Sequence, residues 1–264
     1  SLLGDAVQHQ AIFATTQQKI LRQSCAVRAV AGNPRNFAQN VANINKKAVL
    51  IFSLEMGKEQ LINRMLADAS GVDSFKLETG NFNTEDFAQI SDAMSELSQS
   101  DIFIDDTPGL TVMDMRTKAS RVAHDHELGL IIVDYLQLMS SNSKKAQDNR
   151  VQEVSDISRN LKIMAKELMV PIICLAQLSR GPESRTDKKP MLSDLRDSGA
   201  IEQDADIVMF LYRDSYYEND PSKENIASCV IAKNRHGSQG KADLGWYGQY
   251  TKFTDIDTEH TESR

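Results

Sequence analysis

Three polar side chains of the sequence stand at the ends of short apolar runs, where a fold can bring them together. Glu55 follows AVLIFSL, Asp134 follows LIIV and Gln177 closes IICLAQ. An acid at the end of a buried strand suits magnesium held near a nucleotide phosphate, and a second acid can polarise an attacking water. Taken singly, each residue has a plainer explanation as a helix cap, a solvated strand-end acid or a buried polar cap. Their recurrence after three strands favours a site that handles phosphate.

Two cations form a second candidate group. Lys233 and Arg235 lie two residues apart, directly after the apolar run CVIA. On an extended chain such residues point the same way, so both could hold one phosphate, in this subunit or in a neighbouring one. An ordinary solvated basic turn is the alternative. His236, beside a glycine, is interpreted as a turn residue and not as a catalyst.

The apolar runs that carry these residues alternate with helical patterns. Short runs rich in β-branched residues predict strands buried on both faces, and apolar residues spaced by three and four predict helices, one of them capped by Thr84. The alternation predicts an α/β fold with a mainly parallel β-sheet covered by helices on both faces, which binds ligands at the carboxyl ends of its strands. The strands are expected at 48–54, 102–104, 130–133, 172–177, 207–211 and 228–232, and the helix from Thr84 is expected to bury Phe87, Ile90, Met94 and Leu97.

Composition narrows the classes of protein to which the chain can belong. A length of 264 residues predicts one large domain or at most two. A net charge of −7 provides no chain-wide basic field for nucleic acid, so a polyanion must be held by a local cluster or by an assembly that gathers basic groups. We find no apolar run of membrane-spanning length and no secretory signal, and Cys25, Cys174 and Cys229 lie far apart. These features predict a reduced, cytoplasmic protein without a membrane span, a zinc site or disulfides.

Several longer blocks resemble one family in their order and separation. The chain resembles the motor domain of the DnaB-type replicative DNA helicases, a RecA-like ATPase, from about Phe37 to Phe253. The resemblance implies a RecA-like fold, ATP and Mg²⁺ as cofactors, and movement on single-stranded DNA as a homo-hexameric ring. It also implies primase and a helicase loader as partners. The blocks are LIFSLEM, LIIVDYLQLM, EVSDISRNLKIMAKEL, PIICLAQLSR, SDLRDSGAIEQDAD and IAKNRHG.

The resemblance assigns roles to the candidate site residues. Glu55 matches the catalytic glutamate that activates water, and Asp134 matches the Walker B acid that holds magnesium through water. Gln177 matches the glutamine that couples the γ-phosphate to the DNA-binding loops. Lys233 and Arg235 match the pair that reaches into the adjacent subunit's nucleotide, with Arg235 as the arginine finger.

One further stretch matches the loop that lines the family's central channel and grips the single strand. One arginine and exposed backbone amides in each subunit suit contacts to the phosphate backbone without sequence preference. Copies around a ring would also concentrate basic groups, although each chain is acidic. The matching residues are Arg196, Asp197, Ser198 and Gly199.

The chain departs from the family where the phosphate loop, GxxxxGK followed by Ser or Thr, is expected. There the sequence reads VAGNPRNFAQNVA, in which Gly32 is the only glycine, no Lys is present and Pro34 lacks an amide donor. Gly32 and Arg35 remain as candidates for binding the nucleotide, although the fork of Arg35 does not replace a buried lysine. Three explanations stay open: a missing or scrambled segment, an ATPase-dead paralogue, or a non-standard loop. The presence of all five catalytic candidates favours the first.

These interpretations divide the chain into three parts. Residues 1–36 are a divergent or incomplete segment where the linker and phosphate loop are expected, 37–257 are the RecA-like helicase motor domain, and 258–264 are a C-terminal tail. The family's N-terminal primase-binding domain is not recognisable, which predicts a fragment or a truncated relative. The predicted function is an ATP-driven replicative helicase motor. The alternatives are an ATPase-inactive DnaB-like ring or loader-interacting module, and a recombinase or clock-type ATPase, which the block SDLRDSGAIEQDAD disfavours.

Overall fold

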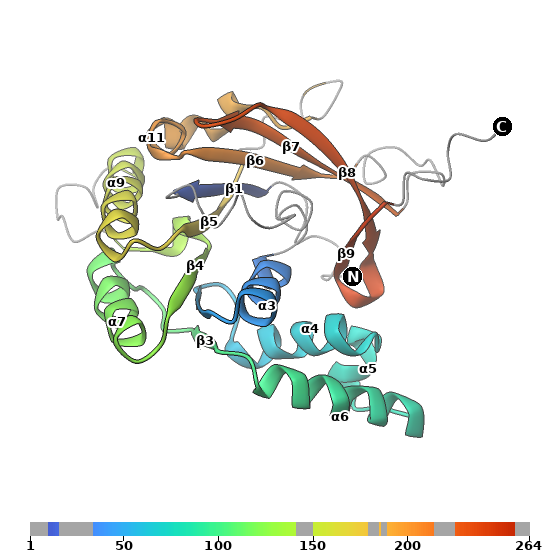
Figure 1. Cartoon of the computed structure of the whole chain (residues 1–264). Helices are drawn as coiled ribbons and strands as arrows, with labels where there is room; N and C mark the ends of the chain where they lie inside the picture. Colours follow the sequence, from blue (N-terminus) through green and yellow to red (C-terminus); the bar gives the residue numbers. More distant parts are fainter. Residues whose placement is uncertain are drawn as a thin grey trace.

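The chain forms a β-sheet of nine strands within the residues that the structure describes, in the order β3-β2-β4-β5-β1-β6-β7-β8-β9 (Figure 1). The structure is a computed structural model, and it describes residues 10–15, 34–140, 150–178, 185, 189–213 and 225–256. The strands are β1 (Gln10–Thr15), β2 (Ala48–Ser53), β3 (Ile102–Asp105), β4 (Leu128–Asp134), β5 (Ile172–Gln177), β6 (Ile207–Tyr212), β7 (Ile226–Asn234), β8 (Gly240–Tyr247) and β9 (Lys252–Asp255).

Strand direction divides this sheet into two parts. β3, β2, β4 and β5 run parallel, and the pairings from β5 through β1 to β9 are antiparallel. The expected α/β class is confirmed and all the expected strands are present, but the expected parallel arrangement holds only for β3, β2, β4 and β5. β1, β8 and β9 were not expected from the sequence. β1 falls within 1–36, the segment predicted to be divergent, and lies in the middle of the sheet between β5 and β6.

Helices cover both faces of the sheet. α7 (Val112–Asp125) and α9 (Arg150–Leu168) pack on one face, and α3 (Pro34–Asn45) and α4 (Lys58–Ser70) pack on the other (Figure 1). Across the described part of the chain, the helices are too short or too polar to cross a membrane. The remaining helices and 3₁₀ turns are α5 (Ser74–Thr79), α6 (Thr84–Ser98), η2 (Leu136–Leu138), η3 (Leu192–Ser198), α11 (Gly199–Asp204) and η6 (Gly248–Tyr250).

Side chains of the parallel strands alternate between two apolar cores. Leu50 and Phe52 of β2 join the core under α7 and α9, whereas Val49 and Ile51 join the core under α3 and α4. β2, β4 and β5 therefore bury both of their faces, which is why the sequence shows continuous apolar runs and not an alternating pattern.

The outer helix α6 departs from the predicted burial. Ile90 is buried as expected, but Phe87 and Met94 are 66% and 56% exposed. α6 packs mainly against α4, so only a narrow stripe of it is covered. The prediction that Phe87 and Met94 belong to the core is therefore wrong, because periodicity defines an apolar stripe without defining how much of it a neighbour covers.

The described cysteines are packing residues. Cys174 and Cys229 are buried, and burial raises the pKa of each thiol to about 12. Both thiols therefore stay protonated at neutral pH and behave as small apolar side chains. Cys25 lies outside the described residues.

Phe52→Ala tests the core between the sheet and helices α7 and α9. Phe52 is fully buried, so its truncation should lower the free energy of unfolding by about 3–5 kcal/mol through lost burial and a cavity. Phe87→Ala is the matched control, because the same truncation at a mostly exposed site should change stability by about 0.5 kcal/mol or less. Denaturant unfolding measures both values, and equal losses would contradict this description of the core.

Candidate active site

Glu55 and Asp134 leave the ends of adjacent parallel strands. Ser53 of β2 lies opposite Asp134 of β4, and Leu54 donates its backbone N–H to the Asp134 carbonyl at 2.7 Å. Glu55 follows one residue later and is exposed, whereas Asp134 is half-buried. Burial raises the pKa of Tyr135, and the charges of both acids raise it further. The two carboxylates therefore lie close enough for both charges to affect Tyr135, at the carboxyl ends of the strands.

The turn that carries Glu55 is anchored on two sides. The buried Ser53 donates its hydroxyl to the Met56 carbonyl at 2.7 Å, which closes the turn after β2. Asp106, which follows the neighbouring strand β3, accepts the backbone N–H of Lys58 at 3.0 Å. This carboxylate satisfies a backbone donor at the start of α4, where a helix lacks internal acceptors. Glu55 therefore lies in a short connection that is fixed at the end of β2 and at the start of α4.

Arg64 of α4 is a site residue that sequence reasoning missed. Burial lowers the pKa of its guanidinium below the usual value. Asp134 opposes this shift most strongly, followed by Glu78 and Glu55. The guanidinium therefore lies in the electrostatic field of the strand-end acids. The available signal was an arginine three residues after the buried Leu61, on the buried side of a helix.

Gln177 is tied to the segment that follows Asp134. Gln137 donates its side-chain N–H to the Gln177 carbonyl at 3.1 Å, and its side-chain oxygen accepts the Gln177 backbone N–H at 3.3 Å. The Gln137 carbonyl accepts a hydrogen bond from Arg150, whose guanidinium also pairs with Glu153 of α9. The ends of β4 and β5 are therefore linked to the start of α9. Gln137 was not identified from the sequence, where nothing distinguishes it from a turn residue.

Lys233 and Arg235 bind the same helix end. Lys233 donates its ammonium to the Glu202 carbonyl, and Arg235 donates its guanidinium to the Gln203 carbonyl at 2.6 Å. Both acceptors belong to the last turn of α11, where unpaired carbonyls attract cations. Arg235 also lies 3.6 Å from the buried Asp206 carboxylate. Burial lowers the pKa of Lys233, and the charge of Arg235 lowers it further. These contacts describe a turn docked on α11 and not a freely solvated one.

The two cations lie at one end of the strands, and the two strand-end acids lie at the opposite end. The β1 pairings align Leu211, near the end of β6, with Gln177, at the end of β5. β7 runs antiparallel to β6, and Asn234 at its end pairs with Ile207 at the start of β6. Three strands also separate β4 from β7, which at about 4.8 Å per step is roughly 19 Å. The cations therefore cannot reach the acids of their own chain.

The remaining predicted site residues are described only in part. Gly32 lies outside the described residues, and Arg35 of α3 and 196–198 of η3 are described by their backbone alone. Gly199 begins α11 with φ −53° and ψ −26°, an ordinary right-handed helical conformation, and an added Cβ would meet open space. The local fold therefore does not require glycine at this position.

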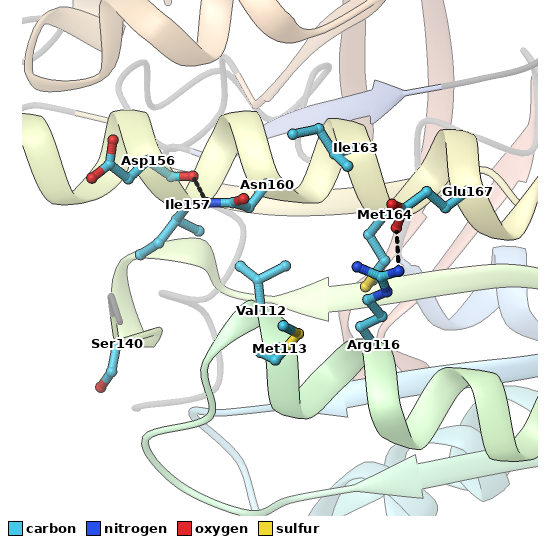
Figure 2. Close-up of a pocket in the computed structure, with 10 residues that line it drawn as sticks. All are labelled: Val112, Met113, Arg116, Ser140, Asp156, Ile157, Asn160, Ile163, Met164 and Glu167. Atoms are coloured by element: carbon cyan, nitrogen blue, oxygen red, sulfur yellow. Dashed lines mark hydrogen bonds and ion pairs between the residues drawn. The ribbon is translucent and has the colours of Figure 1, made fainter. Parts of the chain in front are cut away.

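A pocket of about 270 Å³ lies away from the strand ends, between α7 and α9 (Figure 2). Met113 and Ile163 contribute exposed apolar surface to it. Arg116 of α7 and Glu167 of α9 pair across it at 3.1 Å. It contains none of the predicted site residues, so the candidate active site is defined by the strand ends and not by this pocket.

The fold and the strand-end residues define the class of the protein, a RecA-like α/β domain. Solved structures of this class resemble most of the chain. One of them, an ATPase domain, matches with a TM-score of 0.80 and 40% sequence identity, over 85% of this chain and 79% of that one. A DnaB-like replicative helicase, solved in a study of its interactions with primase, matches with a TM-score of 0.80 and 39% identity, over 87% of this chain and 57% of that one.

The sequence identifies the family within this class. Residues 30–255 match the DnaB-like helicase C terminal domain, so the chain belongs to that family. The replicative DNA helicase DnaC of Bacillus subtilis (strain 168) is 51% identical over 222 residues, which cover 84% of this chain and 49% of that protein. The chain spans about half the length of the curated relatives it matches. The family and the RecA-like fold inferred from sequence blocks are confirmed.

Proposed function

We propose that this chain is the motor domain of a replicative DNA helicase, which couples ATP hydrolysis to movement on single-stranded DNA and to duplex unwinding. The β2–β4 register carries this proposal, because Glu55 follows directly on the backbone hydrogen bond to Asp134. One carboxylate is partly enclosed, as suits a hydrated cation, and the other faces solvent, as suits a base that receives a proton from water. Parallel assays of ATP hydrolysis and strand displacement test it. Hydrolysis that single-stranded DNA never stimulates would contradict it.

ATP and Mg²⁺ are the proposed cofactors. Among the described residues no group of three or more His, Cys, Asp or Glu could hold a metal ion. Mg²⁺ usually keeps several waters and takes one or two carboxylates together with phosphate oxygens, so the strand-end acids fit a cation that arrives with the nucleotide. In this proposal Asp134 holds Mg²⁺ through water, Glu55 orients the attacking water and Gln177 responds to the γ-phosphate. Arg64 balances the negative charge of the two acids.

A homo-hexameric ring is the proposed assembly. The separation of the cations from the acids across the sheet supports it, because Lys233 and Arg235 serve no nucleotide phosphate at their own strand ends. A head-to-tail interface brings the side of one subunit that carries the cations to the side of its neighbour that carries the acids. Repeated by rotation, such contacts close into a ring. Lys233 and Arg235 are then the cations that stabilise the transferring phosphoryl group in the adjacent subunit.

The segment from Arg196 to Gly199 is the proposed contact to single-stranded DNA. Its position at the start of α11, where an added Cβ at Gly199 would meet open space, supports this assignment. Backbone amides and one guanidinium per subunit suit phosphate contacts, which hold DNA of any sequence. A ring of such segments would supply the local positive charge that a chain with a net charge of −7 lacks as a whole.

Arg196→Ala should weaken single-stranded DNA binding about equally across base sequences. Because the proposed contact is to phosphate, the substitution should also flatten the dependence of affinity on salt. Fluorescence anisotropy with homopolymeric and mixed oligonucleotides at several salt concentrations measures both effects. Arg121→Ala, at an exposed site on α7, is the matched control and should change neither. A loss confined to particular base sequences would indicate base recognition and would count against this assignment.

The alternative function is an ATPase-inactive DnaB-like ring or a loader-interacting module. It is favoured by the sequence around Gly32 and Arg35, which lacks a recognisable phosphate loop. ATP hydrolysis by the intact chain separates the two possibilities, because only the active motor turns over bound nucleotide. Primase and a helicase loader are proposed partners, and one solved relative is described together with its interactions with primase. The proposed location is the cytoplasm.

A further inference from the structure

Asp206 is a buried carboxylate that lies outside the strand-end site. It follows α11, precedes β6 and is 4% exposed. Lys162 of α9 contacts one of its carboxylate oxygens at 2.5 Å, and Arg235 lies 3.6 Å from the other. The Asp206 backbone carbonyl also accepts the Arg235 backbone N–H at 2.8 Å. One residue therefore connects α9, the end of α11 and the turn after β7.

α11 is a short, anchored link between two candidate functional segments. It follows directly on Arg196–Ser198, and its last turn binds Lys233, near the end of β7, and Arg235, directly after β7. Ile201 and Ala205 are both 2% exposed and belong to the core that α9 covers. A displacement at the start of this helix is therefore carried to its end by a packed element and not by a flexible loop.

The charge of Asp206 fixes the turn to this link. A buried carboxylate is stable when cations and hydrogen bonds surround it, and here Lys162 and Arg235 do so from two elements. Only 16% of the Lys162 side chain is exposed, whereas 46% of the Arg235 side chain is. The buried lysine thus holds the carboxylate in place, and the carboxylate holds an arginine that still faces solvent.

We propose that Asp206 is a positioning residue that locks the turn of Lys233 and Arg235 onto α11, so that DNA binding at Arg196–Gly199 displaces this turn. The inference rests on the proposed function, because it takes Arg196–Gly199 as the DNA-binding segment. It adds a route by which bound DNA acts on the adjacent subunit's nucleotide. This route runs through α11 at one edge of the sheet, and it is separate from the strand end at Gln177.

Hydrogen exchange of the intact chain, with and without an oligothymidylate, tests the proposal. In the unsubstituted chain, bound DNA should slow exchange in Gly199–Asp204 and also change it at the Arg235 amide, which donates to the Asp206 carbonyl. In Asp206→Asn, bound DNA should still slow exchange in Gly199–Asp204, but it should no longer change exchange at the Arg235 amide. Asp243→Asn is the matched control, because it removes a carboxylate paired with Lys241 at 2.9 Å in the same sheet. Both responses should persist in that control.

A double variant separates positioning from simple charge balance. Asp206→Asn leaves the buried Lys162 without its closest carboxylate, so the single variant can lose stability for that reason alone. Lys162→Met with Asp206→Asn removes both charges, and its melting temperature should return toward that of the unsubstituted chain. If Asp206 only neutralises Lys162, the Arg235 amide regains its response to DNA. If Asp206 holds the turn, the response stays lost in a well-folded protein.

Three results would overturn the inference. One is a retained Arg235 response in Asp206→Asn, and another is its return in the double variant. The third is DNA that binds the unsubstituted chain and slows exchange in α11 without any change at Arg235, which leaves the proposed function intact. A chain that binds no oligothymidylate contradicts the inference and the proposed function together.

Discussion

Glu55→Gln should leave ATP binding intact and lower ATP turnover by about 10²–10⁴-fold, the usual contribution of general-base catalysis. The amide keeps the size of the carboxylate but cannot take a proton from the attacking water. The turn around Glu55 is held by Ser53 and by Asp106, so the substitution removes a charge without releasing the backbone. Steady-state hydrolysis with and without single-stranded DNA measures turnover, and binding of a fluorescent ATP analogue measures affinity.

Glu59→Gln is the matched control for this prediction. Glu59 is an exposed acid in the first turn of α4, so the control removes a similar surface charge four residues away from Glu55. Its turnover should equal that of the unsubstituted chain. Near-normal hydrolysis in Glu55→Gln would remove Glu55 from the mechanism. Absence of hydrolysis in the unsubstituted chain would instead favour the inactive ring.

The ends of the parallel strands were predictable because each depends only on the run of residues that forms the strand. β2 and β4 are buried on both faces, so their side chains are apolar throughout and the first polar residue marks the end of each strand. β5 follows the same rule up to Gln177. The positions of Glu55, Asp134 and Gln177 in the fold follow directly from this boundary.

The antiparallel end of the sheet gives a much weaker sequence signal. β8 buries only Leu244 and Trp246 among its side chains, and β9 contributes Phe253, whose ring lies 4.4 Å from that of Trp246 between centroids. Charged residues occupy exposed positions of β8 before Leu244, namely Lys241 and Asp243. Such strands carry too few apolar positions to be separated from polar loops by composition alone.

The missed site residues depend on contacts between distant segments. Gln137 and Gln177 are 40 residues apart, and Lys162 and Asp206 are 44 apart. Each pairing exists only because two strand ends, or a helix and a strand, meet in the folded sheet. The separation of Arg235 from the acids is of the same kind, because it follows from the lateral order of the strands, which the order along the chain does not reveal.

Arg235→Ala should abolish most ATP turnover while ATP binding persists. Arginine fingers contribute on the order of 10³–10⁵ to phosphoryl transfer, because they stabilise charge that develops only in the transition state. The substitution removes contacts to the Gln203 carbonyl and to Asp206 at the surface of the subunit. Hydrolysis and nucleotide-binding assays as described for Glu55→Gln measure the effect. Turnover close to that of the unsubstituted chain would exclude a finger role.

Mixing two inactive variants tests whether each site is built from two chains. Arg235→Ala subunits keep Glu55, and Glu55→Gln subunits keep Arg235. If the two variants assemble at random in equal amounts, about one boundary in four combines an intact Glu55 with a neighbour's intact Arg235. Mixed rings should therefore regain part of the lost turnover. The control mixes Arg235→Ala with the double variant Glu55→Gln/Arg235→Ala, in which every boundary remains defective.

The arrangement of the sheet makes this complementation a sharp test. Arg235 lies at the edge opposite Glu55, so a role in its own subunit's hydrolysis would need a rearrangement of the antiparallel strands, and mixing would then restore nothing. A role across the boundary needs only that a partly exposed guanidinium exchanges the Gln203 carbonyl and Asp206 for a neighbour's phosphate. Absence of rescue, in rings demonstrated to contain both variants, would contradict the shared site. Rescue would require that one subunit completes the catalytic site of the next, because neither variant alone carries both groups.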